Sequence, residues 1–438
     1  MKTIGILLVL FAALSAKANG LTEKEILARA KDCPTAGYKP RDILVSKPDY
    51  VVYVPRQQGN RKLMDPKRVG DSYNDHFQVL WDAKRSLFYA FWTQASWEGA
   101  GDHHICFSKS ADRGRTWTKP ICLAGSLRRA CKGIDASWQQ PMLSKSGRLY
   151  CLWNYLYDGG YRLYGFYSDD AGESWSDPKH LDYTLPSYGK YRGWINWQRP
   201  LRLGKDGRYF VGSSLYDGVE FWEFDNIDDD PEMRDIRITY LAREKGARLG
   251  GERMKEVPKY FMPAGKTSPV VAEASVVRLP DARLFALMRS SVGHPLWSQS
   301  RDGGCTWSDP KILRTKDGGR KFLHPCSPCP IYDHAGCEAG SGRYFAFVHD
   351  TFDFSNTNTH YQTRGPYYMI TGKFAPKAEQ PIEFSETKPF VMRTDGWNSF
   401  YTSYTVVDGK GILWYPDKKY YLLGREIGDE WFEEKTRK

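Results

Sequence analysis

The stretch Ser110-Ala-Asp-Arg-Gly-Arg-Thr-Trp117 recurs twice in this chain, as Ser168-Asp-Asp-Ala-Gly-Glu-Ser-Trp175 and as Ser300-Arg-Asp-Gly-Gly-Cys-Thr-Trp307. Each copy reads Ser-x-Asp-x-Gly-x-Thr/Ser-Trp and lies between a strand-like run and a proline. The Asp can bind backbone N–H groups of its own turn, the Gly allows a positive φ, and the Trp can cover the neighbouring sheet. Three such turns between strand signals predict a β-propeller.

The spacing of the copies predicts the number of blades. Asp112 and Asp170 are 58 positions apart, and Asp170 and Asp302 are 132 apart, or two steps of 66. A repeat of this length suits a four-stranded blade with loop insertions, so one blade without the motif should lie between the second and third copies. Roughly 370 residues divided by about 60 give about six blades. The predicted fold is all-β, a six-bladed propeller of four-stranded antiparallel blades, with seven blades as the alternative.

The first residues read as a secretory signal. Lys2 precedes an apolar run over residues 4–14, and Ala16-Lys-Ala18 forms a cleavage pattern. The run is too short to span a bilayer, and no later segment approaches about 18 apolar residues. We therefore predict a signal peptide over residues 1–18 and a secreted or periplasmic protein without a membrane span.

The predicted mature chain is a single propeller over residues 49–428. Residues 19–48 form an N-terminal extension with a short helix that starts at a capping box, Thr22-Glu-Lys-Glu25. Residues 429–438 form a charged tail. The segment 225–258 is charged and less regular, which predicts a long inter-blade loop or insertion.

Composition favours an acidic carbohydrate as the partner. The formal net charge is +11, and cleavage after Ala18 removes two lysines and leaves about +9. The chain has 15 Trp and 28 Tyr, which suits a carbohydrate-binding surface. For an exported propeller this charge favours an acidic glycan over nucleic acid, and a generally basic soluble surface is the alternative. We expect a monomer.

Cysteine and histidine positions give weaker signals. Nine Cys allow at most four disulfides, and Cys106 and Cys122, which flank the first motif, could bridge adjacent strands. Cys326-Ser-Pro-Cys329 has no second CxxC beside it, so we interpret it as a structural bridge or as loop cysteines. No histidine spacing indicates a metal site. No cofactor is required, and a structural Ca²⁺ ion would be compatible with an exported propeller.

The repeated motif resembles the Asp-box of the sialidase (neuraminidase) superfamily, and the chain resembles sialidases over most of its mature length. The resemblance implies a catalytic site at the propeller axis. Such a site has a Tyr nucleophile, a Glu that takes the Tyr proton, an Asp acid/base and three Arg that bind the substrate carboxylate. A neutral phenol attacks an anomeric centre that bears a carboxylate with less repulsion than a carboxylate would.

Local matches assign these roles by resemblance. The segment from Ala272 to Arg289 is similar to the sialidase strand pair that carries the Glu and one Arg, which implies Glu273 and Arg289. Tyr401 matches the nucleophile, with Tyr404 as the alternative. The structural alternatives are a solvated strand residue for Glu273, a core aromatic for Tyr401 and an ion pair with a structural carboxylate for Arg289.

The remaining matches are less complete. Asp102, upstream of the first Asp-box, matches the acid/base, with a turn residue as the structural alternative, and Arg364 is the candidate for a further clamp Arg. Sialidases begin the propeller with Arg-Ile-Pro, whereas the strand here reads Asn74-Asp-His-Phe-Gln78, with His76 where the Arg would be. Since His is shorter and mostly neutral at pH 7, a bidentate grip on carboxylate would be lost. A substrate other than sialic acid is therefore predicted.

His76 also suggests a second chemistry. The chain is similar to propeller polysaccharide lyases of the ulvan-degrading type, which act on uronate polymers with His, Tyr and Arg. β-Elimination needs a base, an acid for the leaving oxygen and a cation for the enolate-like intermediate. The candidates for these roles are His76, His103, His104, Tyr155, Tyr188, Tyr191 and Arg199. Trp197, two positions before Arg199, is a further substrate-binding candidate, as is Tyr188.

Three hypotheses follow from the sequence. The leading one is a sialidase-like exo-glycosidase that acts on an acidic sugar, with Asp102, Tyr401, Glu273 and Arg289 at its centre. The second is a polysaccharide lyase that uses His76, His104, a Tyr and Arg199. The third is a non-catalytic glycan-binding propeller.

Overall fold

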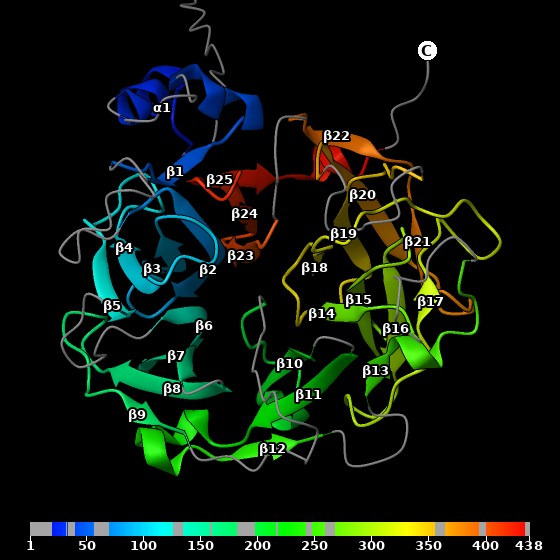
Figure 1. The fold of residues 1–438 in the computed structure, drawn as a ribbon, viewed down its shortest axis with the longest axis horizontal. Coiled ribbons are helices and arrows are strands. Elements are labelled where there is room, and N and C mark those ends of the chain that lie inside the picture. The colour runs from blue at the N-terminus through cyan, green and yellow to red at the C-terminus, as the bar shows by residue number, and fades with distance from the viewer. Residues whose placement is uncertain are drawn as a thin grey trace, which may run out of the picture.

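The computed structural model describes residues 20–31, 33, 40–56, 70–125, 135–157, 160–181, 198–215, 218–241, 248–258, 268–354, 364–393 and 400–433. Six antiparallel sheets stand around one axis (Figure 1), so the predicted six-bladed propeller is confirmed and the seven-bladed alternative is wrong. The predicted signal peptide lies outside the described residues. In the part of the chain that is described, no helix is long and apolar enough to cross a membrane.

The first three blades follow the chain in order. Blade 1 contains β2 (Tyr73–Asp82), β3 (Leu87–Ala95), β4 (His104–Ser110) and β5 (Ile121–Gly125). Blade 2 contains β6 (Ala136–Leu143), β7 (Leu149–Tyr157), β8 (Gly160–Ser168) and β9 (Lys179–His180). Blade 3 contains β10 (Tyr209–Leu215), β11 (Gly218–Phe224), β12 (Ile238–Tyr240) and β13 (Leu249–Gly250), and both outer strands pair with β11.

The last three blades include one that uses both ends of the chain. Blade 4 contains β14 (Val271–Arg278), β15 (Leu284–Ser290), β16 (Leu296–Ser300) and β17 (Lys311–Ile312). Blade 5 contains β18 (Ile331–Asp333), β19 (Arg343–Val348), β20 (Tyr367–Phe374), β21 (Ile382–Phe384) and β22 (Lys388–Val391). Blade 6 contains β23 (Ser403–Val407), β24 (Lys410–Asp417), β25 (Tyr421–Ile427) and, as its outermost strand, β1 (Tyr50–Tyr53).

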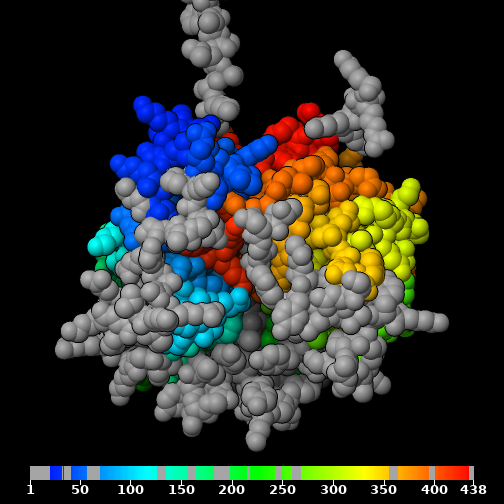
Figure 2. Space-filling view, turned by 45° about the horizontal axis from the view of Figure 1, so that its top comes forward, coloured from blue at the N-terminus to red at the C-terminus, as the bar shows by residue number. Residues whose placement is uncertain are grey.

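The N-terminal extension packs over the place where the ring closes. Helix α1 (Glu23–Ala30) starts with the capping box, in which Thr22 Oγ1 accepts from Glu25 N at 3.3 Å and Glu25 Oε2 accepts from Thr22 N at 2.7 Å. The 3₁₀ helix η1 (Pro40–Ser46) leads from it toward β1. In Figure 2 this N-terminal region lies beside the C-terminal strands, as the β1–β25 pairing requires.

Blade 3 corrects one expectation. The segment 225–258 is not an inter-blade loop, because it supplies the outer strands β12 and β13 of this blade. The rest of its described part includes three 3₁₀ turns, η4 (Ile227–Asp229), η5 (Met233–Asp235) and η6 (Gly251–Arg253). Strands of two and three residues are too short to show a period in the sequence. Blade 3 is the blade without an Asp-box that the spacing predicts between the second and third copies of the motif.

The three Asp-boxes connect β4 to β5, β8 to β9 and β16 to β17. In the third box, Asp302 accepts from Thr306 N at 2.8 Å, from Thr306 Oγ1 at 2.5 Å and from Ser300 Oγ at 2.8 Å. Gly304 has φ of +96°, and a Cβ there would lie 2.6 Å from Phe210 of the preceding blade. The other two boxes repeat these contacts around Asp112 and Asp170. The motif therefore has the structural role that its chemistry predicts.

Each box Trp packs on the preceding blade, as predicted. The ring of Trp307 in blade 4 stacks on Phe221 of blade 3 at 4.4 Å, and Trp175 in blade 2 meets Phe107 of blade 1 at 5.5 Å. Trp117 lies edge-on to Trp414 of blade 6 at 5.7 Å. These contacts join neighbouring sheets through large apolar surfaces.

A hydrogen bond also joins every pair of neighbouring blades. One bond at each interface, starting between blades 6 and 1, is Val79 N to Ser403 Oγ (2.9 Å), Gln139 Nε2 to Phe91 O (3.2 Å), Leu143 N to Tyr209 Oη (3.0 Å), Glu273 N to Ser214 Oγ (2.6 Å), Ile331 N to Ser275 Oγ (3.1 Å) and Tyr332 Oη with Thr402 Oγ1 (2.6 Å). Buried polar groups must be paired, so these bonds fix the register of each blade against the next.

We predict that Asp170→Ala lowers the free energy of unfolding by about 1–3 kcal/mol, because it leaves backbone and hydroxyl donors of the turn without their charged acceptor. Hydrogen bonds from the Ser174 side chain and backbone lower the pKa of Asp170 to about 2, so its charged form is the one that the turn binds. Urea denaturation measures the change. The matched control is Asp177→Ala, an exposed carboxylate seven positions later, which should change stability by less than about 0.5 kcal/mol. Equal losses in the two variants would contradict this role.

Candidate active site

Three inner strands carry the same local distortion. β2, β6 and β14 each contain a register shift, and at each shift one non-glycine residue has a positive φ: His76 (52°), Trp138 (56°) and Glu273 (52°). A bulge turns a side chain away from the direction that regular pleating would give it. Such a left-handed residue costs on the order of 1–3 kcal/mol and tends to mark functional sites. The three bulges therefore point to a site on the inner edges of blades 1, 2 and 4.

Glu273, Arg289 and Tyr401 form one hydrogen-bonded cluster. Tyr401 Oη donates to Glu273 Oε1 at 2.8 Å. Arg289 Nη1 donates to both Glu273 oxygens at 3.0 Å and to Tyr401 Oη at 3.3 Å. The bulge explains the contact between Glu273 and Arg289, since the regular pair in the β14–β15 ladder is Ala272 with Arg289. Ser214 of blade 3 fixes the bulge by accepting from Glu273 N at 2.6 Å.

His76 joins this cluster from a third blade. Its ring stacks on Tyr401 with centroids 4.5 Å apart, and meets Trp138 edge-on at 5.9 Å. Blades 1 and 4 lie across the ring from each other, so side chains from both can meet Tyr401 only near the axis (Figure 1). The structure thus brings together four residues that the sequence singled out: His76, Glu273, Arg289 and Tyr401.

Electrostatics keep Tyr401 neutral and Arg289 charged. Burial and the negative charge of Glu273 raise the pKa of Tyr401 well above its ordinary value, although Arg289 opposes the rise. Burial works against the charged form of Arg289, but Cys326, Glu273 and Tyr401 outweigh it and raise its pKa. Arg289 Nε also donates to Cys326 Sγ at 3.2 Å. Tyr401 can therefore lose its proton only to a close acceptor, and Glu273 is that acceptor.

Asp102 and His104 lie in a different arrangement. The Asp102 carboxylate accepts from Ser96 N at 3.1 and 3.2 Å and from Ser96 Oγ at 2.5 Å, which closes the loop between β3 and β4. His104 is buried, with Nε2 3.0 Å from Gln94 Oε1 and Nδ1 3.1 Å from the Asp102 carbonyl oxygen. Neither set of contacts reaches the Tyr401 cluster.

Of the other lyase candidates, His103 lies close enough to His76 for its charge to lower the pKa of His76, whereas Arg199 and Tyr155 have other partners. His103 stacks on Tyr73 at 5.5 Å, and its Nδ1 lies 3.0 Å from Ser137 Oγ. Arg199 donates to its neighbour Pro200 O at 3.3 Å, and Tyr155 packs in the aromatic core of blade 2. Tyr188, Tyr191 and Trp197 lie outside the described residues. Among the residues predicted for elimination that the structure describes, His76 alone contacts Tyr401.

Sequence reasoning missed a charged group beside His76. Lys419 Nζ lies 2.7 Å from Glu98 Oε2 and 3.4 Å from Asp75 Oδ2. Burial pushes the pKa of Glu98 upward, but the charges of Lys419, Arg364 and Arg289 hold it below its ordinary value. Arg364, a predicted substrate-binding residue, therefore lies near the same centre. Burial raises the pKa of Asp75 to about 7, against the opposing charge of Lys419.

Comparison with known proteins supports the fold. A model of the BNR repeat-like domain matches residues 86–322, more than half of the chain. The chain belongs to the BNR repeat-like family. Among curated proteins, no sequence matches it.

Solved structures similar to this BNR repeat-like chain include sialidases. A protein of unknown function from Dyadobacter fermentans is 14% identical, with a TM-score of 0.55 over 86% of this chain and 96% of that one. The NanB sialidase from Streptococcus pneumoniae is 11% identical, with a TM-score of 0.54 over 81% of this chain and 67% of that one. The leech intramolecular trans-sialidase complexed with 2,7-anhydro-Neu5Ac is 12% identical, with a TM-score of 0.52 over 82% and 68%. Identities this low show a shared fold alone.

The cysteines and the possible metal ligands of this BNR repeat-like protein are further candidates for parts of a site. Cys106 and Cys122 are opposite each other in the β4–β5 register, but the structure contains both as thiols and not as the predicted disulfide. Cys326 and Cys329 are buried thiols. Within the described ranges, no group of three or more His, Cys, Asp or Glu side chains is arranged to hold a metal ion.

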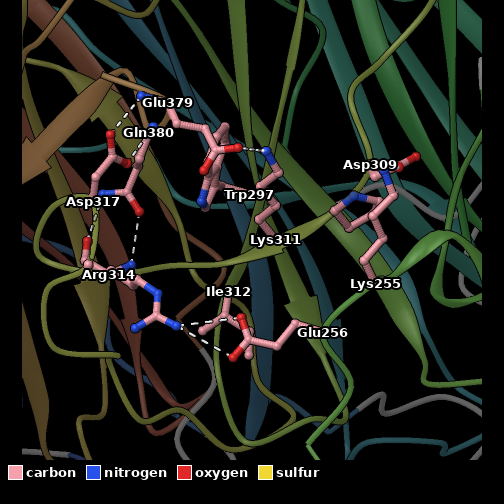
Figure 3. Close-up of a pocket in the computed structure, with 12 residues that line it drawn as sticks. Lys255, Glu256, Trp297, Asp309, Lys311, Ile312, Arg314, Asp317, Glu379 and Gln380 are labelled. Atoms are coloured by element: carbon pink, nitrogen blue, oxygen red, sulfur yellow. Dashed lines mark hydrogen bonds and ion pairs between the residues drawn. The ribbon is translucent and has the colours of Figure 1, made fainter. Parts of the chain in front are cut away.

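A pocket away from the axis is not a second candidate. It has a volume of about 260 Å³ and is drawn in Figure 3, where the labelled lining residues are Lys255, Glu256, Trp297, Asp309, Lys311, Ile312, Arg314, Asp317, Glu379 and Gln380. Arg314 pairs with Glu256 at 3.4 Å, and Lys255 pairs with Asp309 at 3.0 Å. Trp297 is buried, so it presents no open face to a sugar ring.

We predict that His104→Gln flattens the pH dependence of stability between pH 4.5 and 6.5. Burial lowers the pKa of His104 to about 4, whereas an unfolded histidine has a pKa of about 6.5. The unfolded chain therefore binds a proton that the folded chain does not, and stability is lost as pH falls through this window, by about 1 kcal/mol per pH unit. Urea titrations across this range measure the slope.

The control for this test is His180→Gln, an exposed histidine on β9. It should leave the slope unchanged. An unchanged slope in the His104 variant would mean that the folded protein protonates His104 as readily as the unfolded chain does.

Proposed function

We propose that this propeller is a sialidase-like exo-glycosidase that acts on an acidic glycan, with a preference other than sialic acid. The Tyr401–Glu273–Arg289 cluster is the observation that supports this proposal most directly. Blade 6 supplies a neutral phenol, and blade 4 supplies a carboxylate that accepts its proton at 2.8 Å and a guanidinium 3.3 Å from the same oxygen. A nucleophile within reach of its base is the arrangement that covalent catalysis requires.

The cluster allows a balanced two-step reaction. Tyr401 Oη attacks the anomeric carbon while Glu273 takes its proton, and Arg289 stabilises the negative charge on the phenol oxygen during the transfer. The bond to the leaving oxygen breaks as an acid gives that oxygen a proton. Water then attacks the glycosyl–Tyr401 intermediate, the same acid acts as the base, and Tyr401 recovers its proton from Glu273. Two displacements retain the anomeric configuration.

The loop between β3 and β4 supplies the acid/base. The sequence favours Asp102, but both of its oxygens bind Ser96 in this structure. Glu98 lies on the same loop with a side chain that is 62% exposed, and it lies near Arg289 and Arg364. We therefore assign a loop-closing role to Asp102 and the acid/base role to Glu98, whose pKa must rise when it leaves the ammonium of Lys419 before it can donate a proton.

His76 supports elimination as a second candidate. Its Nδ1 is buried without a hydrogen-bond partner among the described residues, and burial together with the charges of Lys419 and His103 lowers its pKa well below the ordinary value. A neutral imidazole stacked on the ring of Tyr401 has the composition of a base–acid pair for β-elimination on a uronate. Products distinguish the two reactions, since elimination leaves an unsaturated uronate that absorbs ultraviolet light and hydrolysis consumes water.

We predict that Tyr401→Phe lowers kcat by about 10²-fold or more on an acidic glycoside, because the phenol oxygen that attacks is removed. Release of product from a panel of sialylated, uronic-acid-rich and sulfated glycans measures the effect. The matched control is Tyr404→Phe, whose hydroxyl donates to His334 O at 2.8 Å on the neighbouring blade.

Tyr404→Phe should keep most of the activity. A glycosidase that works equally well with Phe at 401 contradicts the assignment. Binding of a glycan without any product indicates a lectin, and an ultraviolet-absorbing product that depends on His76 indicates the lyase.

A further inference from the structure

The turn between β24 and β25 holds a strained backbone at the axis. Tyr420 N donates to Asp417 O at 3.0 Å, and the two central residues, Lys418 and Lys419, have φ of 57° and 56°. Positive φ at both positions is the geometry of a type I′ turn, for which Asn-Gly is the usual sequence. Two lysines in this conformation are unfavourable, and strain of this kind persists where the surroundings enforce it.

Blade 1 enforces this conformation. Asn74 N donates to the Lys419 carbonyl at 2.7 Å, and Asn74 Nδ2 donates to the Tyr420 carbonyl at 2.9 Å. The docked turn directs the Lys419 side chain inward, where it is only 8% exposed and its Nζ lies over the ring of Tyr73 at 5.6 Å. Lys418, its neighbour in the turn, carries the same charge but is less deeply buried.

The position of Lys419 matters because of what His76 lacks. His76 stands where the sequence resemblance would place a carboxylate-binding Arg, and its imidazole is neutral. Lys419 binds Asp75, the residue before His76, so its ammonium lies beside the vacant guanidinium position but comes from blade 6. Arg289 and Arg364 act on the same carboxylate, Glu98, that Lys419 holds at 2.7 Å.

We propose that Lys419 is a substrate-binding residue, which together with Arg289 and Arg364 receives the carboxylate of an acidic sugar, and that Glu98 occupies part of this anion site until the sugar displaces it. The proposal rests on the proposed function, since it names the substrate group that the same site binds. Of the two partners of Lys419, Asp75 is fully buried and Glu98 is exposed, so Glu98 is the one that a ligand can displace. An ammonium binds carboxylate as a point charge without the bidentate geometry of Arg. This difference favours acidic sugars whose carboxylate is oriented differently from that of sialic acid.

Calorimetric binding, which needs no turnover, tests the proposal. The probes are methyl α-D-glucuronide and N-acetylneuraminic acid, with methyl α-D-glucoside as the neutral counterpart of the first. We expect Lys419→Met to weaken binding of the preferred acid by about 10-fold or more and to leave the neutral sugar unchanged, because only the acid loses an ionic partner. The matched control, Lys418→Met, changes neither.

Glu98→Gln supplies a second and opposite result. It removes the competing carboxylate, so binding of the acidic sugar should tighten several-fold while turnover falls. A merely structural ion pair would give no such gain. The proposal is overturned if Lys419→Met weakens the acid and the neutral sugar equally, if Glu98→Gln does not tighten binding of the acid, or if the wild-type protein binds neither acid.

The two proposals fail separately. Lys419-dependent binding without glycoside cleavage would contradict the proposed hydrolysis and leave the anion site intact. If the Lys419→Met protein binds and cleaves an acidic glycoside as well as the wild-type protein does, the proposed anion site is contradicted and the proposed hydrolysis is not.

Discussion

The pairing of β1 with β25 is the constraint on which the rest of this structure depends. Tyr50 and Val51 add the outermost strand to blade 6, in register with Gly424 and Leu423, and thereby close the ring. Tyr401 directly precedes the innermost strand of that blade, so the closed ring sets its distance to Glu273, 128 positions earlier, and to His76 in blade 1. Ordering so long a chain is entropically costly, and the hydrogen bonds at all six interfaces together with the box tryptophans supply part of what offsets it.

Left-handed backbone at strand bulges distinguishes three inner strands of this propeller. His76, Trp138 and Glu273 adopt left-handed backbone conformations at bulges, and the turn that carries Lys419 has two more such residues. Regular strands would alternate side chains between the two faces of a blade, whereas a bulge aims one of them along the inner edge. The same left-handed conformation also occurs in tight turns, including Arg113 and Ala171 of the first two Asp-boxes, so it is the bulge in an inner strand that sets the centre apart from the rim. His76 Nδ1, at one of these bulges, is buried and has no hydrogen-bond partner in the described part of the chain.

The fold and half of the site could be read from the sequence, for different reasons. The Asp-boxes are local, since Asp302 binds groups within four positions, so eight residues suffice to recognise each turn. Glu273 and Tyr401 were recognisable by resemblance. The choice between Asp102 and Glu98 depends on a loop contact with Ser96, and the role of Lys419 depends on docking against Asn74, 345 positions away. Contacts of this kind form only when the ring closes, so the hydrophobic pattern of the sequence does not predict them. A Lys-Lys pair between two strand-like runs, where Asn-Gly is usual, was the one available signal.

The central claim is that ring closure makes Tyr401 the nucleophile of a glycosidase. Mass spectrometry after reaction with a fluorinated glycosyl fluoride of the best-cleaved acidic sugar tests it most directly, because the fluorine slows breakdown of a covalent intermediate. The account predicts one glycosyl adduct per chain, on the peptide that contains Tyr401, and none in the Tyr401→Phe protein. An adduct on another residue would contradict it. So would an enzyme that cleaves its substrate normally, keeps its activity in the presence of the reagent and forms no adduct.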